Sequence, residues 1–313
     1  MMIEAGKLRS AGGATRVAGV ELGGTKCVAV LSRDGTQIDE QVTVPTSDPV
    51  ATLSALAGVL DGWWRSEQFQ ALGIASFGPI ALDPNFPEYG RITTTSKPGW
   101  QGADVLGALA APFPVPSAFD TDVNGAALAE GRWGDARGLD DYAYVTVGTG
   151  VGVGLIVAGR PTRGFGHCEL GHVGVPRLPG ADWPGNCPFH GSCVEGLASG
   201  SAIGARMARL GWDQSPAPDH MFWDEPADAL AQLCQMLVLS TAPRRILIGG
   251  GVTNGQPHLL DKVEARLRQI LAGYVDLPAP TGAYVTGPGL GDLAGPMGPI
   301  AMALTLCEHH AAS

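Results

Sequence analysis

The sequence contains no long apolar run and no extended basic segment. No stretch approaches the roughly 18 apolar residues that a membrane-spanning helix needs, and residues 1–15 lack the apolar core of a secretory signal. The longest basic run is Arg244-Arg245 and the net charge is −10, which disfavours a nucleic-acid partner. We therefore expect a cytoplasmic protein that binds neither membranes nor nucleic acids.

The chain also lacks a disulfide framework and the two common nucleotide-binding fingerprints. Its six cysteines follow no regular spacing, which is typical of a reducing compartment. Cys27, Cys168, Cys234 and Cys307 are expected in the core, because free cysteine is among the most buried residue types. Neither G-x-x-x-x-G-K-[ST] nor a G-x-G-x-x-G that opens a helix is present, which argues against P-loop and dinucleotide-binding folds.

What the chain does contain is one structural unit that occurs twice. With 313 residues, 45% of them hydrophobic, it can bury the core of one large domain or two ordinary ones. Residues 17–31 and 142–157 both read as strand, glycine turn, strand, and further strands and helices follow each copy. The repeat predicts two α/β lobes that face each other across a cleft.

The remaining pattern places the other elements and the lobe boundary. Helices are predicted from residue 48 onward and over 105–111, 123–133, 196–210, 227–239, 258–271 and 297–308, and strands over 37–44, 71–77, 245–248 and 283–286. The loop 83–100 is too long for a simple connection and is predicted to be functional. Three prolines near residue 115 suggest a small lobe over 1–115, completed by a terminal helix at about 297–313, and a large lobe over 116–296.

Three glycine turns are candidates for nucleotide binding. They comprise Gly23, Gly24, Thr25 and Lys26; Gly148, Thr149, Gly150 and Gly152; and Gly249, Gly250 and Gly251. Glycine turns expose backbone N–H groups to phosphate without interference from a Cβ atom. A tight hairpin explains any one of them taken alone, but three in this order favour a nucleotide whose phosphates are clamped between the lobes.

Asp122 is the predicted general base. It follows a strand and stands at the start of the predicted helix over 123–133, where the helix dipole keeps a carboxylate ionised. Such a group accepts the proton of a hydroxyl whose oxygen attacks a γ-phosphoryl group, while Mg²⁺ and backbone turns neutralise charge. The alternative is an N-cap, a role that Asp120 or Asp122 would fill and that is compatible with catalysis.

A compact set of metal-ligand residues follows. Cys187, His190 and Cys193 stand three residues apart, with His172 upstream. Zinc binds thiolate and imidazole in a tetrahedron, so these four residues are the predicted ligands of a structural Zn²⁺. The alternative is unliganded side chains packed in a core.

Acidic residues flank this set at Glu169 and Glu195. Carboxylates and imidazole accept hydrogen bonds from hydroxyl groups, so Glu169, His172 and Glu195 suit a sugar. For Glu195 the alternative is a favourable charge in the first turn of a helix. We expect the metal to brace a substrate pocket.

These motifs together resemble those of a known family. They are Glu21-Leu22-Gly23-Gly24-Thr25-Lys26, Phe119-Asp120-Thr121-Asp122-Val123-Asn124-Gly125-Ala126-Ala127, Val147-Gly148-Thr149-Gly150-Val151-Gly152, the region 169–200, and Ile92-Thr93-Thr94-Thr95-Ser96-Lys97-Pro98-Gly99-Trp100. They look like the phosphate, catalytic and zinc motifs of the ROK sugar kinases, in particular of the fructokinase branch. The resemblance runs from Val17 to the C-terminal helix.

The resemblance implies an actin-like ATPase (ribonuclease H-like) α/β fold, with two lobes around a nucleotide and sugar cleft. It implies Asp122 as the base, ATP on the glycine turns, and Glu169, His172 and Glu195 on the sugar. Thr121 stands where the glucokinase branch usually has Asn, and Ser96 replaces a Pro common in the fructokinase form.

The implied reaction is ATP-dependent phosphorylation of D-fructose at its C6 hydroxyl, with ATP, Mg²⁺ and structural Zn²⁺ as cofactors. Mannokinase, glucokinase or broad hexokinase activity is the alternative within the class. A sugar-responsive repressor of the same family would carry a DNA-binding domain before the first glycine turn, where this chain has residues 1–16. A zinc-braced binding module without catalysis is the third reading. The sequence leaves the oligomeric state open, a homodimer included.

Overall fold

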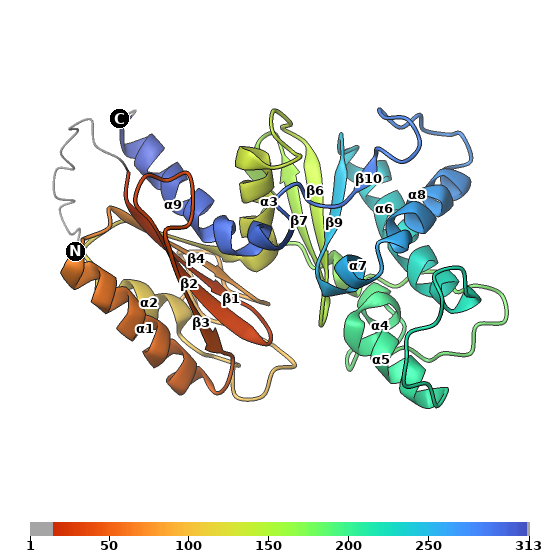
Figure 1. Ribbon diagram of the computed structural model, residues 1–313, viewed down its shortest axis with the longest axis horizontal. Coiled ribbons are helices and arrows are strands. Elements are labelled where there is room, and N and C mark those ends of the chain that lie inside the picture. Colours follow the sequence, from red (N-terminus) through yellow and green to blue (C-terminus); the bar gives the residue numbers. More distant parts are fainter. Residues whose placement is uncertain (1–14, 312–313) are drawn as a thin grey trace.

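The computed structural model describes residues 15–311. The expected loose tail over 1–15 lies outside the described residues apart from Thr15, and so do residues 312–313 of the expected terminal helix. The described chain forms two five-stranded sheets that follow one another along the long axis of the molecule, with helices packed between and outside them (Figure 1).

The first sheet has the strand order β3-β2-β1-β4-β5. Its strands are β1 (Val17–Leu22), β2 (Lys26–Ser32), β3 (Glu40–Pro45), β4 (Ala71–Ser76) and β5 (Ser117–Thr121). β1 and β2 form the predicted hairpin, and β1, β4 and β5 run parallel. Leu22 is level with Ser76, which is level with Thr121. The segments that follow these three strands therefore leave the sheet at the same edge.

This sheet extends past the lobe boundary expected at residue 115. β5 pairs with β4 over five residues, and the Phe119 side chain is buried in the core of the first sheet. The N–H of Leu72 donates to the carbonyl of Pro116, which ties the proline segment before β5 to β4. The chain passes to the second sheet only after α3 (Asp122–Trp133).

The second sheet has the order β10-β9-β6-β7-β8. Its strands are β6 (Tyr142–Val147), β7 (Val151–Val157), β8 (Arg160–Pro161), β9 (Ile246–Gly249) and β10 (Val285–Thr286). β6 and β7 form the second predicted hairpin, and β6, β9 and β10 are parallel. Thr146 is level with Gly249, so the second and third glycine turns lie at one edge of this sheet.

Two helices, α3 and α9 (Ala294–Ala311), pack against each other between the sheets (Figure 1). Glycines on the strands allow this close approach. A Cβ atom at Gly73 of β4 would lie 1.9 Å from the carbonyl oxygen of Pro299 in α9, and one at Gly154 of β7 would lie 2.2 Å from the carbonyl oxygen of Val123 in α3. Any side chain at either position would push a helix off its sheet.

The other faces carry the remaining helices. α1 (Pro49–Ser66) and α2 (Val105–Ala110) cover the first sheet; the second sheet carries α4 (Val194–Ala198), α5 (Gly200–Arg209), α6 (Asp224–Thr241), α7 (Gly251–Gly255) and α8 (His258–Leu271). Short 3₁₀ turns are η1 (Leu170–His172), η2 (Met221–Trp223) and η3 (Gly291–Leu293). The helix predicted over 196–210 is two helices, because the Ser199 hydroxyl accepts a bond from Ala202 N (3.2 Å) and caps α5.

One buried carboxylate holds both connections between the sheets. Glu130 of α3 is wholly buried and accepts hydrogen bonds from the N–H groups of Asp135 (2.9 Å), Gly289 (3.0 Å) and Leu290 (2.8 Å). Asp135 lies on the way from α3 to β6, and the other two lie on the way from β10 to α9. A charged group buried at this depth requires such partners, so Glu130 fixes the geometry at which the two sheets are joined.

Candidate active site

Three acidic side chains gather at the edge of the first sheet where its parallel strands end. Glu21 is near the end of β1, Asp122 directly follows β5, and Glu169 precedes η1. The charge on Asp122 raises the pKa values of both Glu21 and Glu169, which identifies the three carboxyl groups as neighbours. A Cβ atom at Gly295 would lie 2.3 Å from Glu21 Oε1, so the Glu21 carboxylate also lies against the N-terminal end of α9.

The two aspartates around Thr121 have different surroundings. Asp120 is buried and fully engaged: its carboxylate accepts from Thr121 N (2.8 Å), Asn124 Nδ2 (2.8 Å) and Arg163 Nη2 (2.6 Å). Neither aspartate is the N-cap of α3. That role belongs to Thr121, whose hydroxyl accepts from Asn124 N (3.2 Å). Asp122 is half-buried, and its Oδ1 accepts from the adjacent Val123 N (2.9 Å), which leaves Oδ2 available for a ligand.

The acidic cluster is poised to titrate near neutral pH. Burial raises the pKa of Asp122 to about 6, although the Val123 N–H opposes the shift. Burial and the Asp122 charge raise the pKa of Glu21 to about 7, with Lys26 opposing. Burial and the charges of Asp122 and Glu195 raise the pKa of Glu169 to about 7, but 42% of its side chain is exposed, so water screens part of this effect. A cation beside these groups would favour their ionised forms.

The first glycine turn, residues 23–26, joins β1 to β2 and is open to solvent. A Cβ atom at Gly24 would meet no atom within 4 Å, and Thr25 and Lys26 are exposed. The Thr46 hydroxyl donates to Gly23 O (2.8 Å), which holds the turn from the side of β3. The turn therefore presents solvent-exposed backbone at Gly24 beside the acidic cluster.

The second glycine turn, residues 148–152, is contacted from its own lobe at Thr149 and Val151, although the Thr149 side chain is exposed and a Cβ atom at Gly148 would meet open space. Glu195 Oε2 accepts from Val151 N (3.0 Å), and a Cβ atom at Gly150 would lie 2.5 Å from the same oxygen. The Ser201 hydroxyl donates to Thr149 O (2.5 Å). Gly152 is already within β7, and a Cβ atom there would lie 2.7 Å from Val123 of α3, so this glycine serves helix packing and does not face the turn's open side.

The third glycine turn, residues 249–251, follows β9 at the same edge. Gly250 has φ +98°, a conformation that other residues rarely adopt, and it starts the short helix α7. Gly249 is buried in β9 against the Tyr144 hydroxyl, whereas a Cβ atom at Gly251 would meet open space. Of the three, Gly251 is the one exposed to a ligand at this edge.

The four predicted metal ligands converge. The ligand atoms of His172, Cys187, His190 and Cys193 all lie within 4.8 Å of one another. Cys187 Sγ is 3.6 Å from His172 Nδ1 and 3.8 Å from His190 Nδ1, and Cys193 Sγ is 3.8 Å from His172 Nδ1. A tetrahedral zinc with Zn–S of about 2.3 Å and Zn–N of about 2.0 Å separates S and N by about 3.5 Å. The donor set and its spacing therefore fit zinc.

This cluster is connected directly to the predicted sugar residues. The Cys193 sulfur accepts from Gly196 N (3.5 Å) as the N-cap of α4, the helix whose first turn carries Glu195. His172 directs Nδ1 toward the cysteines and Nε2 toward Glu195 Oε1, at 4.0 Å. The imidazole thus lies between the metal-ligand cluster and a carboxylate that also reaches the second glycine turn.

Three charged or polar side chains near the site were not predicted. Glu21 is the acidic residue directly before the first glycine turn, a position that the pattern itself could have indicated. Lys97 lies in the loop 83–100, and its ammonium donates to the carbonyl of Gly24 and lies 5.8 Å from the Phe77 ring centroid. His167 bonds to Ile80 N (3.0 Å) across the two halves of the chain. No sequence pattern indicates the Lys97–Gly24 and His167–Ile80 contacts, since each joins residues more than 70 positions apart.

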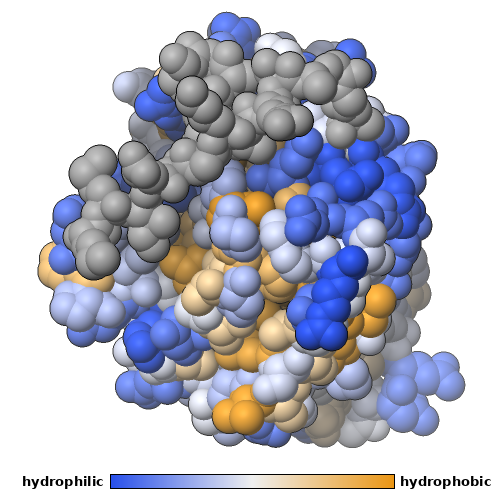
Figure 2. Space-filling view, turned by 90° about the vertical axis from the view of Figure 1, so that its left-hand side faces the viewer, coloured by the Kyte–Doolittle hydropathy of each residue, from blue (hydrophilic) through white to orange (hydrophobic). Residues whose placement is uncertain are grey.

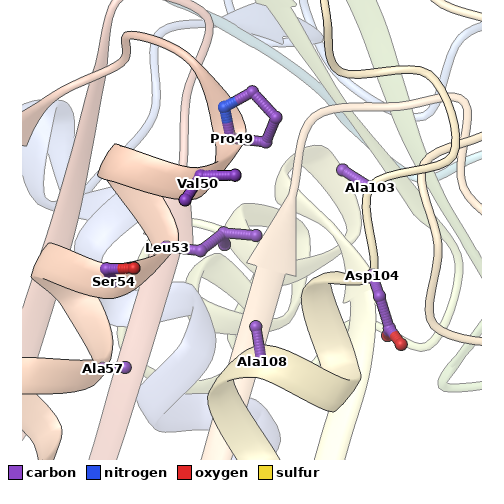
Figure 3. Close-up of a pocket in the computed structure, with 8 residues that line it drawn as sticks. All are labelled: Pro49, Val50, Leu53, Ser54, Ala57, Ala103, Asp104 and Ala108. Atoms are coloured by element: carbon purple, nitrogen blue, oxygen red, sulfur yellow. The ribbon is translucent and has the colours of Figure 1, made fainter.

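An apolar groove lies elsewhere, between α1 and α2 (Figure 3). It has a volume of about 340 Å³ and is lined by Pro49, Val50, Leu53, Ser54, Ala57, Ala103, Asp104 and Ala108. Apolar side chains gather on the end of the molecule that faces the viewer in Figure 2. The Asp104 carboxylate is already engaged by Gly107 N (2.8 Å) and Arg91 Nη2 (3.0 Å). The groove contains none of the predicted site residues.

Known structures define the class of fold. A ROK hexokinase from Thermus thermophilus matches with a TM-score of 0.76 and 27% identity, over 94% of this chain and 99% of that one. A ROK family glucokinase from Streptomyces griseus, solved with glucose and AMPPNP, matches with a TM-score of 0.72 and 24% identity, over 93% and 99%. The predicted actin-like ATPase fold with two α/β lobes is confirmed.

The ROK family model matches residues 17–306, and the chain belongs to this family. It is 40% identical to a fructokinase of Pediococcus pentosaceus over 284 residues, which cover 91% of this chain and 96% of the relative. It is also 40% identical to a fructokinase of Zymomonas mobilis over 289 residues, or 91% and 95% of the two chains. Within residues 15–311, no helix has both the length and the apolar character needed to cross a bilayer.

Proposed function

We propose that the protein transfers the γ-phosphoryl group of ATP to the C6 hydroxyl of D-fructose. The observation that carries the proposal is the Asp122 carboxyl group, which has a free oxygen at the strand edge beside an open glycine turn. Five relatives named as fructokinases, at 33–40% identity over most of the chain, support the choice of fructose.

Asp122 acts as the general base. As the sugar oxygen attacks the γ-phosphorus, the bond from that phosphorus to the bridging oxygen breaks, ADP leaves with the electron pair, and the hydroxyl proton passes to Asp122 Oδ2. The position of Asp122 in the first turn of α3 favours its ionised form through the helix dipole. Asp120 is unsuited to this role, because its buried carboxylate already accepts from Thr121 N, Asn124 Nδ2 and Arg163 Nη2.

ATP binds along the two strand edges that carry the glycine turns. The first turn offers its backbone to the transferred phosphate and Lys97 adds a positive charge beside it, while the second and third turns hold the rest of the nucleotide. Glu21 carries hard oxygen donors of the kind that Mg²⁺ prefers and would hold the ion beside the phosphates. Bound Mg²⁺ would neutralise charge that develops on the transferred group.

The sugar occupies the space bounded by Glu169, His172 and Glu195. Each carboxylate accepts hydrogen bonds from sugar hydroxyls, and His172 Nε2 is the ring atom that faces away from the cysteines. Zn²⁺ held by His172, Cys187, His190 and Cys193 would be structural, because four protein ligands complete its coordination. It would fix α4, and with it Glu195, relative to His172.

The small lobe is proposed to consist of the first sheet, its outer helices and the terminal helix, and the large lobe of the rest. Sugar and nucleotide would then be enclosed as the lobes approach. The connections held by Glu130 are the hinge candidates, since both chain crossings meet there.

A coupled ADP-release assay against a panel of hexoses tests the proposal. Turnover should be highest with fructose and should require Mg²⁺. Asp122→Asn should lower kcat by about 10²–10⁴-fold, while Asp120→Asn should lower stability more than turnover because its bonds are structural. Absence of hexose-dependent ADP release, or near-normal turnover of Asp122→Asn, would contradict the proposal.

A broader hexokinase activity, with mannose or glucose, is the second candidate. It is favoured by the glucokinases and the ROK hexokinase among the similar proteins, and the same base and carboxylates would serve any hexose. The relative kcat/KM values across the panel separate the two activities. A non-catalytic sugar-responsive regulator has no need of the free Asp122 oxygen and is the weakest reading.

A further inference from the structure

His167 lies where the loop after β4 meets the loop before η1. The first loop belongs to the first sheet and the second loop follows β8 of the second sheet. Only 5% of the His167 side chain is exposed. A Cβ atom at Gly78 would lie 3.1 Å from His167 Cε1 and 3.5 Å from Glu169 Oε1. The imidazole and the Glu169 carboxylate therefore pack together on the backbone of Gly78.

The hydrogen bonds of the ring determine its tautomer. His167 Nε2 accepts from Ile80 N at 3.0 Å, so this nitrogen carries no proton. Burial lowers the pKa of His167, and the ring is neutral at neutral pH. The remaining proton is therefore on Nδ1. The hydrogen bond of this nitrogen is to the Cys168 carbonyl at 3.5 Å, and Glu169 Oε1, a stronger acceptor, lies within reach at 3.4 Å.

The loop that His167 contacts is itself fixed from the other side. Thr93 donates to the carbonyl of Pro79 through both N (2.7 Å) and Oγ1 (3.1 Å). A continuous series of polar contacts and backbone segments therefore runs from Thr93 through Pro79 and Ile80 to His167 and Glu169. It connects the loop 83–100 of the first lobe with a carboxylate of the second lobe.

We propose that His167 is a positioning residue that orients the Glu169 carboxylate for the sugar and couples this carboxylate to the first lobe. The proposal rests on the proposed function, in which Glu169 binds a sugar hydroxyl. A neutral imidazole suits this task, because it can donate one bond to the carboxylate 3.4 Å away without neutralising the charge that accepts the sugar hydroxyl.

Three substitutions of His167 distinguish the roles of its two ring nitrogens. Asn places its amide where Nδ1 lies and can still donate to Glu169. Gln places its amide near Nε2 and can still accept from Ile80 N, and Ala can do neither. We expect His167→Ala and His167→Gln to raise the KM for fructose about tenfold, the effect of losing a hydrogen bond to a charged group, and His167→Asn to restore most of it. kcat and the dissociation constant for ATP should change by less than about twofold. His220→Ala, which removes a ring that packs on Trp212 at 5.3 Å, serves as the matched control.

A double-mutant cycle with Glu169→Gln tests whether His167 acts through Glu169. In that background His167→Ala should add little, because its partner is already altered. The inference is overturned if the two effects on KM multiply, if His167→Asn is as damaging as His167→Ala, or if His167→Ala leaves KM unchanged. In the last case a raised KM for Glu169→Gln would show that the proposed sugar site stands without His167. An unchanged KM for Glu169→Gln would contradict both the proposed sugar site and the proposed role of His167.

Discussion

The two glycine hairpins have the same strand pattern but different surroundings. The turn 23–26 of the first sheet is open, and charged groups lie near it: Glu21, Asp122 and the Lys97 ammonium. The turn 148–152 of the second sheet is contacted by Glu195 and Ser201 from its own lobe. Under the proposed function the reactive groups lie on the first sheet, and the second sheet carries a binding wall that zinc would brace.

The largest expected contrast comes from one substitution in each turn. Gly24→Val places a branched side chain in open space, so the protein should fold and lose ATP affinity and turnover by about 10²-fold, with sugar binding retained. Gly150→Val would displace the Glu195 carboxylate, which lies 2.5 Å from the new Cβ atom, and should weaken both sugar and ATP binding. Calorimetric titration with each ligand measures the difference.

Gly58→Val on the exposed side of α1, where a Cβ atom also meets open space, is the control for both changes. If Gly150→Val weakened ATP alone, Glu195 would not connect the second turn to the sugar. If Gly24→Val left ATP affinity intact, the first turn would not contact phosphate.

Substitution of Lys97 tests whether the first glycine turn, residues 23–26, needs a positive charge beside it. Lys97→Met should lower kcat with ATP by about tenfold to a hundredfold, since a cation that neutralises transition-state charge is lost, and Lys97→Arg should recover part of it. The control is Lys262→Met, which removes a lysine of α8 that is paired with Asp224 of α6. Steady-state kinetics in which only the KM for sugar changed would show that Lys97 serves the loop and not the phosphate.

The contacts of Glu195 with the second glycine turn, residues 148–152, should depend on the metal. Cys187→Ser should lower the zinc content, reduce the free energy of unfolding by about 4 kcal/mol or more, and raise the KM for fructose about tenfold as α4 loses its anchor. ATP affinity should change less. Cys307→Ser, outside the cluster, provides the comparison. Metal analysis and thermal unfolding measure these effects, and full activity with less than about half an equivalent of zinc would contradict the proposed site.

The smallest effect concerns the stability cost of the acidic cluster. The pKa of Asp122 is about 6 when folded and about 3.9 when unfolded. Between these pH values the folded protein binds this proton more tightly than the unfolded protein does. The contribution of the Asp122 carboxyl group to stability is therefore present below about pH 4 and is lost as pH rises through 6. Asp122→Asn removes the cost, so its Tm should equal that of the wild type near pH 4 and exceed it by a few degrees near pH 8.

The measurement is thermal unfolding without nucleotide, sugar or Mg²⁺, each of which would change the charge balance. Asp120→Asn should behave in the opposite way and lower the Tm near pH 8, because its carboxylate is paired with Arg163. An equal response of both variants would mean that the two neighbouring aspartates do not differ in the way that their hydrogen bonds indicate.

Local patterns in the sequence were sufficient for the two hairpins, the strand before Asp122 and the cluster of four Cys and His side chains. Each of these depends on residues that are close in the chain, where periodicity, turn chemistry and ligand spacing act directly. The same reasoning erred where a single polar side chain decided the outcome. Thr121 caps α3 in place of an aspartate, and Ser199 divides one predicted helix into two.

The sequence by itself determined which chemical groups the protein carries and in which turns they lie. Only the tertiary structure decided which of them meet. The parallel register of β1, β4 and β5 brings Glu21 beside Asp122, and the packing of two lobes places His167 on Ile80 and Lys97 on Gly24. It also turned Gly152 toward α3 and away from the open side of its turn. Such contacts depend on sheet register and helix packing over long chain separations, and no local pattern encodes them.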